Sequence, residues 1–176
     1  MRKVKRITEH FVIECYYNEE GKLHREDGPA KLYWHYKKDD IENCSNGILN
    51  KEEYYLNGKL FRTDGPAIIK YANKNVSYEL FLGLENGLQS ISYKYQKNEL
   101  MYKKEMFKND ITVITHFRSG NVSLKTYSKN GVFHKIGGPA VIRYSNGKII
   151  EQEYYLNGIR ADELQSLVLE TLKDEC

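Results

Sequence analysis

The chain has 176 residues, with 27 basic and 24 acidic side chains and a formal net charge of +3. This length is sufficient for one domain with a hydrophobic core, and so small an excess of positive charge does not require nucleic acid or an anionic membrane as a partner. The aromatic residues are 15 Tyr, 6 Phe and 1 Trp, a balance that suits thin sheets wetted on at least one face.

The first ten residues, MRKVKRITEH, contain no apolar run after their basic side chains. They therefore do not form a secretory signal, and no later stretch reaches the length of a membrane span. Three cysteines lie far apart, at Cys15, Cys44 and Cys176. An odd number of widely spaced cysteines fits a reducing compartment better than a disulfide framework. We expect a cytoplasmic protein without a membrane span.

One segment recurs along the chain, namely residues 54–67 with the sequence YYLNGKLFRTDGPA. Its partial copies are residues 22–30, 132–140 and 154–158, and longer matches without a gap join 45–58 to 145–158 and 117–131 to 144–158. Repetition of this kind predicts short structural units that stack on one another.

Each unit has the pattern of a β-hairpin. Residues 140–144 alternate, so that Ala140, Ile142 and Tyr144 share one face of a strand. The Asn-Gly pairs that follow supply the positive φ angles that a tight hairpin turn needs. The first unit also contains an insertion at residues 35–44, rich in Lys and Asp, which we predict to be a projecting loop.

One position in the second strand of each unit carries a large aromatic or flexible apolar side chain. Its occupants are Tyr17, Tyr54, Phe81, Met106, Tyr127 and Tyr154. Because a large side chain is kept while the rest of the unit varies, we expect this position to be buried. Each side chain would stack on the next copy and contribute about 1.5–3 kcal/mol of burial.

The segment HREDGPA places His24, Arg25 and Asp27 close together and therefore resembles an active site. Its copies argue against catalysis, because the position of His24 is occupied by Phe61 in the second copy, and a phenyl ring cannot transfer a proton. We predict instead an ion pair between Arg and the Asp two residues later in the first two loops, because the third loop has Lys135 and Gly137 at these positions. The three prolines of the chain each follow a glycine in these loops and fix the angle of the next strand.

The chain changes character after residue 160. Residues 161–173 predict an amphipathic helix with one apolar stripe, formed by Leu164, Leu167, Val168 and Leu172. We expect this helix to cap the last unit, with a partner-binding helix as the alternative. The predicted organisation is a β-hairpin repeat domain at residues 1–160, followed by a C-terminal amphipathic capping helix at 161–176.

No pattern in the chain predicts a chemical reaction. The five histidines show no metal spacing with cysteine, and there is no phosphate-binding glycine loop or nucleophile elbow. We therefore expect no catalytic residue, no metal and no cofactor. Nucleic acid is also not expected, because six glutamates in the predicted strands would repel phosphates. They are Glu14, Glu52, Glu53, Glu79, Glu151 and Glu153.

These units resemble the MORN-like repeats, which are short β-hairpin units with Tyr and Asn-Gly punctuation. The segments GKLHREDGPA (residues 21–30) and NGKLFRTDGPA (57–67) resemble the variant that is common in proteins of large DNA viruses and phages. They are also similar to MORN-variant proteins described as bacterial antitoxins. The resemblance covers residues 11–160 and implies a mainly β fold, an elongated antiparallel meander or solenoid of stacked hairpins. For a viral protein, the compartment would be the host cytoplasm.

We therefore expect a non-enzymatic repeat protein that acts as a protein–protein interaction or scaffold module. The alternatives are an antitoxin-like neutralising partner and a single-stranded nucleic-acid binder. The expected contacts with a protein partner are exposed aromatic side chains and the insertion that follows Trp34. The aromatic residues are Tyr33, Trp34, Tyr55 and Tyr155.

Overall fold

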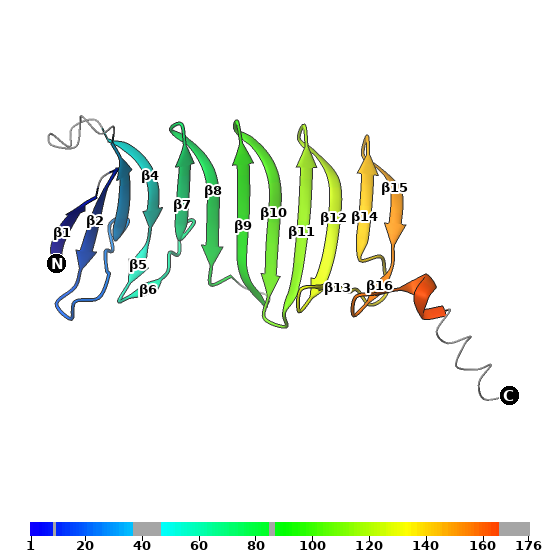
Figure 1. Ribbon diagram of the computed structural model, residues 1–176. Coiled ribbons are helices and arrows are strands. Elements are labelled where there is room, and N and C mark those ends of the chain that lie inside the picture. Colours follow the sequence, from blue (N-terminus) through cyan, green and yellow to red (C-terminus); the bar gives the residue numbers. More distant parts are fainter. Residues whose placement is uncertain (9, 37–46, 85–86, 166–176) are drawn as a thin grey trace. The chain divides into compact units, whose positions relative to one another are not determined.

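The computed structural model describes residues 1–8, 10–36, 47–84 and 87–165. The strands are β1 (Arg2–Ile7), β2 (Phe11–Tyr17), β3 (Lys31–His35), β4 (Ile48–Glu53), β5 (Tyr55–Leu56), β6 (Lys59–Leu60), β7 (Ile68–Ala72), β8 (Asn75–Leu82), β9 (Leu88–Gln96), β10 (Glu99–Phe107), β11 (Ile111–Arg118), β12 (Asn121–Lys129), β13 (Val132–Phe133), β14 (Val141–Ser145), β15 (Lys148–Glu153), β16 (Tyr155–Leu156) and β17 (Ile159–Arg160). The predicted mainly β, antiparallel meander of hairpins is confirmed (Figure 1).

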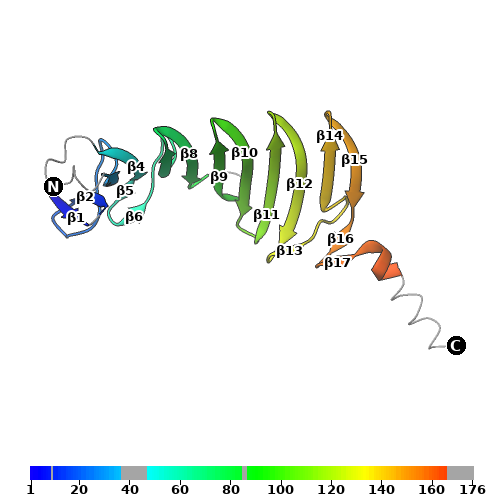
Figure 2. The ribbon, with the colours of Figure 1, turned by 45° about the horizontal axis from the view of Figure 1, so that its top comes forward.

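A single open sheet contains thirteen of these strands. Its order is β1-β2-β3-β4-β7-β8-β9-β10-β11-β12-β14-β15, with β13 paired to β12, and β1 and β15 are the edge strands. The short pairs β5–β6 and β16–β17 form two separate small sheets. Each of these small hairpins follows directly after a strand of the large sheet, β4 or β15 (Figures 1 and 2).

The chain divides into two compact parts, called unit 1 and unit 2, each of which is larger than one hairpin repeat. Unit 1 comprises residues 1–85 and 90–98, and unit 2 comprises residues 86–89 and 99–176. A helical segment occupies residues 161–165, where the sequence predicts the start of the C-terminal helix. The rest of that helix, with Leu167, Val168 and Leu172, lies outside the described residues. Residues 37–44 of the predicted insertion at 35–44 also lie outside them, whereas His35 belongs to β3.

Two-residue turns connect the hairpins, as the Asn-Gly pairs predict. Both central residues have positive φ in the pairs Asn57–Gly58, Asn73–Lys74, Lys97–Asn98, Ser119–Gly120, Asn130–Gly131, Asn146–Gly147 and Asn157–Gly158. Positive φ at both positions is the type I′ geometry, which matches the right-handed twist of the flanking strands. The turns therefore fix the register of each hairpin locally.

The buried core is thin. The described part of unit 1 contains strands, turns and loops but no helix that could cover a sheet face. The buried apolar residues are Val12, Cys15, Ala30, Leu32, Tyr36, Ala67, Val113, Val141, Ala140 and Ile142. Most of the other strand side chains are half-buried, which explains the preference for tyrosine over phenylalanine.

The aromatic position of the first copy differs by one residue from the sequence prediction. The backbone N–H of Tyr16, rather than that of Tyr17, donates to the carbonyl oxygen of Ala30 at 2.8 Å. The same bond joins Tyr54 to Ala67 at 2.9 Å and Tyr127 to Ala140 at 2.7 Å. Tyr17 is on the opposite face of β2, since neighbouring strand residues point to opposite sides.

The prediction that this aromatic position is buried is wrong. The rings of Tyr16, Tyr54 and Tyr127 are only half-buried, and Tyr154 is 47% exposed. The fully buried side chains of the three copies are instead the alanines at the ends of the Gly-Pro-Ala loops. The rings of Tyr16, Tyr54 and Tyr127 are thus covered only in part.

Candidate functional site

Each Gly-Pro-Ala loop places a cation over the tyrosine at the end of the preceding strand. The distances from the cation to the ring centroid are 4.4 Å for Arg25 over Tyr16, 4.0 Å for Arg62 over Tyr54 and 3.8 Å for Lys135 over Tyr127. A cation at this distance is attracted by the negative face of the ring. The loop thus folds back on its own strand and replaces part of the missing second layer.

In the first two loops the arginine also forms the predicted ion pair. Arg25 Nε donates to Asp27 Oδ1 at 2.8 Å, and Arg62 Nε donates to Asp64 Oδ1 at 3.0 Å. The sequence hypothesis of an Arg–Asp brace in these loops is confirmed. In the third loop the position of the aspartate is occupied by Gly137, so its lysine contacts the ring without this brace.

The glycine of each loop leaves room for the same cation. A Cβ atom added to Gly65 would lie 2.9 Å from Arg62 Cζ, and one added to Gly28 would lie 3.1 Å from Arg25 Cζ. At Gly138 the nearest atom, in Lys135, would be 3.4 Å away. The arginine is thus held between the tyrosine ring and the glycine backbone, whereas the lysine leaves more space.

We expect Gly65→Ala to destabilise the protein by about 1 kcal/mol more than Gly138→Ala. At Gly65 the added methyl group displaces the guanidinium of Arg62 from the ring of Tyr54 and the carboxylate of Asp64. Part of the attraction between the cation and the ring is then lost. Both variants share the small gain that alanine brings by restricting the unfolded chain. Urea denaturation of the two variants measures the difference, and equal stabilities would contradict this role of Gly65.

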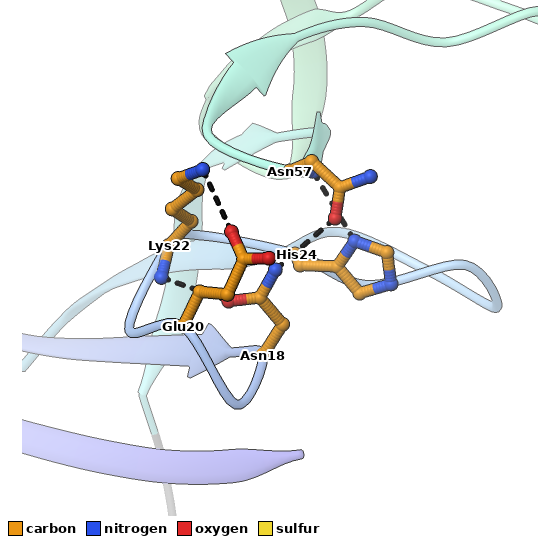
Figure 3. Close-up of polar contacts among 5 residues, drawn as sticks. All are labelled: Asn18, Glu20, Lys22, His24 and Asn57. Atoms are coloured by element: carbon orange, nitrogen blue, oxygen red, sulfur yellow. Dashed lines mark hydrogen bonds and ion pairs between the residues drawn. The ribbon is translucent and has the colours of Figure 1, made fainter.

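A cluster of polar contacts joins the first loop to the β5–β6 hairpin (Figure 3). His24 Nδ1 accepts a hydrogen bond from the backbone N–H of Asn57 at 3.2 Å, and Asn18 Nδ2 donates to Asn57 Oδ1 at 3.1 Å. Asn18 Oδ1 also accepts from the backbone N–H of Lys22 at 2.9 Å, while Lys22 Nζ contacts Glu20 Oε2 at 2.7 Å. Because Nδ1 of His24 is the acceptor, its other ring nitrogen carries the proton.

The third loop repeats this contact and the second loop does not. His134 Nδ1 accepts from the backbone N–H of Asn157 at 3.1 Å, at the turn of the β16–β17 hairpin. At the second loop the equivalent side chain is Phe61, whose ring lies near Gly83. Each histidine therefore binds a turn N–H of the next hairpin, a structural role that the sequence did not reveal.

A groove with a volume of about 660 Å³ lies between the first and second loops of unit 1. It is lined by Arg25, Glu26, Asp27, Gly28, Pro29, Tyr54, Leu56, Phe61, Arg62, Thr63 and Asp64. The hydrogen bonds from the arginines hold the pKa of Asp27 and of Asp64 below the usual value for a carboxyl group. The arginine beside each carboxylate therefore favours its ionised form.

The structure brings two of the predicted contact residues, Tyr33 and Tyr55, into one neighbourhood in unit 1. The ammonium groups of Lys31 and Lys51 lie 4.9 and 5.2 Å from the centroid of the Tyr33 ring. Burial is the main cause that raises the pKa of Tyr55, and the negative charge of Glu53 raises it further. The positive charge of Lys31 lowers this pKa. Both tyrosines are half-buried and belong to a charged sheet face.

The other two predicted contact residues lie elsewhere. Trp34 is on the opposite face of β3 and is half-buried, and its indole N–H is buried without a hydrogen-bond partner among the described residues. Tyr155 belongs to unit 2, where its hydroxyl donates to Glu153 Oε2 at 2.9 Å and its ring lies 5.3 Å from that of Phe133. Trp34 therefore does not share a site with Tyr33 and Tyr55.

The edge strand β15 is a feature that the sequence did not single out. In the described part of unit 2, no strand pairs with its outer side. Ile149 and Ile150 on this strand are 53% and 65% exposed. The other edge strand, β1, carries basic side chains at four of its six positions, and charges on an edge discourage pairing with further strands.

The described residues contain neither a metal-binding cluster nor a membrane-spanning helix. No group of three or more His, Cys, Asp or Glu side chains there is arranged to hold a metal ion. No helix in this part of the chain has the length and apolar character needed to span a bilayer. The candidate sites described above are the loop groove, the sheet faces and the β15 edge.

Fold and surfaces together define an open, single-layer antiparallel β protein. Comparisons with protein-family models, with curated proteins and with solved structures found no match to this chain.

Proposed function

We propose that the chain is a MORN-like repeat protein, of the kind found in large DNA viruses and phages, and that it acts as a non-enzymatic protein-interaction module. In this proposal the edge strand β15 is the docking position for an extended segment of a partner protein. The observation that carries it is the open outer side of β15 with two exposed isoleucines. Main-chain hydrogen bonds to such an edge supply affinity, and the side-chain contacts supply specificity.

The two isoleucines suit this docking mode. Ile149 and Ile150 are neighbours in the strand and lie at a register shift, where Arg143 is opposite Glu151 and Tyr144 is opposite Ile149. Ile150 is the extra residue of this bulge. A partner strand added beside β15 would cover the exposed parts of both isoleucines. Arg143 Nε lies 2.8 Å from Glu151 Oε2, so that a charged group of β15 is already neutralised within unit 2.

The proposal includes a reducing, cytoplasmic setting. Cys15 is a free and buried cysteine in the described part of the chain. Free thiols persist in reducing compartments, whereas exported domains with a small core are usually stabilised by disulfides.

The test compares two single substitutions in unit 2. Ile150→Lys adds a charge to the β15 edge, and Ile136→Lys adds the same charge at an isoleucine that is 81% exposed in the third loop. We expect an affinity matrix carrying the wild type or Ile136→Lys to retain the same protein from an extract of the source cells. The Ile150→Lys matrix should retain it at least about tenfold less well, which corresponds to 1.4 kcal/mol.

Two results would contradict the proposal. Equal retention by all three matrices would show that the partner does not use the β15 edge. Concentration-dependent oligomers of the wild type in sedimentation velocity, abolished by Ile150→Lys, would assign the edge to self-association instead of a separate partner.

A further inference from the structure

The strand register aligns two rows of side chains on one face of unit 1. The rows are Cys15–Lys31–Glu53–Ile68–Leu80–Ser92 and Ile13–Tyr33–Lys51–Lys70–Tyr78–Lys94. Residues opposite one another in antiparallel strands share a face. We call this surface the lysine face, defined by Lys31, Lys51, Lys70, Lys94, Tyr33 and Tyr78.

Most acidic groups of these strands are on the other face. Glu14, Glu52 and Glu79 are paired in register with Leu32, Ile69 and Tyr93. Glu14 is neutralised by Lys3 at 3.1 Å, and Glu52 and Glu79 accept hydrogen bonds from tyrosine hydroxyls. The sequence-based objection that these glutamates repel phosphates therefore does not apply to the lysine face.

One glutamate, Glu53, does lie on the lysine face. It is only 6% exposed and forms an ion pair with Lys51. Its charge is thus largely hidden from an approaching ligand and is compensated by a neighbour. The lysines of this face whose side chains are exposed are Lys70 and Lys94.

Tyrosine rings lie among these lysines. Lys70 Nζ lies 5.1 Å from the centroid of the Tyr78 ring. Lys31, two residues before Tyr33 in β3, and Lys51, opposite it in β4, both place their ammonium groups near the Tyr33 ring. The two rings are three strands apart, which corresponds to about 14 Å. Rings on which bases stack, set among cations that contact the backbone, are the recurring pattern of single-strand binding surfaces.

We propose that the lysine face of unit 1 binds single-stranded nucleic acid, with the lysines contacting phosphates and Tyr33 and Tyr78 stacking on bases. A single strand suits this surface because its bases are unpaired and can reach the rings. An acidic peptide would use the lysines alone. This activity is separate from protein docking at β15, which lies in unit 2, and it does not depend on it.

The test measures binding of fluorescein-labelled oligothymidine by anisotropy at salt concentrations between about 50 and 200 mM. The double variant Lys70→Gln/Lys94→Gln should reduce the slope of log affinity against log salt by about 1.4, since each phosphate contact on a single strand contributes about 0.7. The double variant Tyr33→Leu/Tyr78→Leu should weaken binding at least about fivefold through lost stacking. Melting curves of both double variants are recorded to check that they are folded.

The matched control is Lys3→Gln/Lys5→Gln, which removes the same charge from the opposite face of unit 1. It should leave the salt slope close to that of the wild type. The proposal is overturned if the wild type does not bind oligothymidine at about 50 mM salt, or if the control weakens binding as much as the lysine-face variant. It is also overturned if the tyrosine variant binds normally while polyglutamate competes as well as oligothymidine, because the occupant is then an acidic polymer.

Discussion

Replacing Ala67 by leucine is expected to lower the free energy of unfolding by about 1–3 kcal/mol, the usual cost of overpacking. Ala67 is 0% exposed. Its N–H donates to the carbonyl of Leu80 at 2.7 Å, and its own carbonyl accepts from the N–H of Tyr54 at 2.9 Å. These bonds to β8 and to Tyr54 hold the backbone of Ala67 in place. A larger side chain at this fully buried position therefore has to displace its neighbours. Urea denaturation followed by far-UV circular dichroism measures the change.

The matched control is Ala72→Leu in the same unit. Ala72 is exposed at the end of β7, and substitutions at such positions usually change stability by less than about 0.5 kcal/mol. If Ala67→Leu and Ala72→Leu had the same small effect, the thin core would not depend on the loop alanines. An equal loss from Ala140→Leu would extend the argument to unit 2, because Ala140 is bonded to Tyr127 in the same way.

The hairpins were predictable because their determinants are local. An Asn-Gly pair needs no distant partner to adopt positive φ at both positions, and pairs such as Asn146–Gly147 do so. The alternation of residues 140–144 likewise predicts a strand from neighbouring residues alone. The Arg–Asp brace belongs to the same class, since Arg62 and Asp64 are two residues apart.

The burial of the aromatic position was not predictable in the same way. Tyr16 and Tyr17 are adjacent and chemically identical, so only the bond from Tyr16 to Ala30 shows which one is equivalent to Tyr54. Alternation along a strand also does not reveal whether a second layer covers the sheet. The cation over each ring depends on the loop folding back, which the sequence pattern does not specify.

The separation of charge between the two faces of unit 1 was hidden by irregular pairing. The register shifts between Tyr33 and Trp34 and again between Lys70 and Tyr71. One extra residue at a bulge changes which side chains share a face. Counting alternate residues therefore cannot place Lys51 and Lys94 on one face. For the same reason, the sequence does not show that most glutamates of these strands lie on the opposite face.

Replacing Tyr54 by alanine is expected to destabilise the protein by about 1.5–3 kcal/mol, the burial contribution of a large side chain. The ring is half-buried, so the value lies below that of a fully buried aromatic residue. The substitution removes the platform under Arg62, 4.0 Å from the ring centroid. It also removes the hydroxyl that donates to Glu52 at 3.3 Å, although Glu52 keeps a second donor in Tyr71 at 3.2 Å.

Two controls distinguish the contribution of the Tyr54 ring from that of its hydroxyl group and from that of an equivalent ring without a cation over it. Tyr54→Phe keeps the platform and should cost only about 0.5–1.5 kcal/mol, the net value of one hydrogen bond. Tyr154→Ala removes the equivalent ring of the last copy, which is 47% exposed. The position that holds the cation in the other copies is occupied by Asp162 in this one. Its effect should stay within about 1 kcal/mol. Equal losses at Tyr54 and Tyr154 would show that the cation over the ring contributes nothing, and that burial in the thin sheet alone determines the stability of each copy.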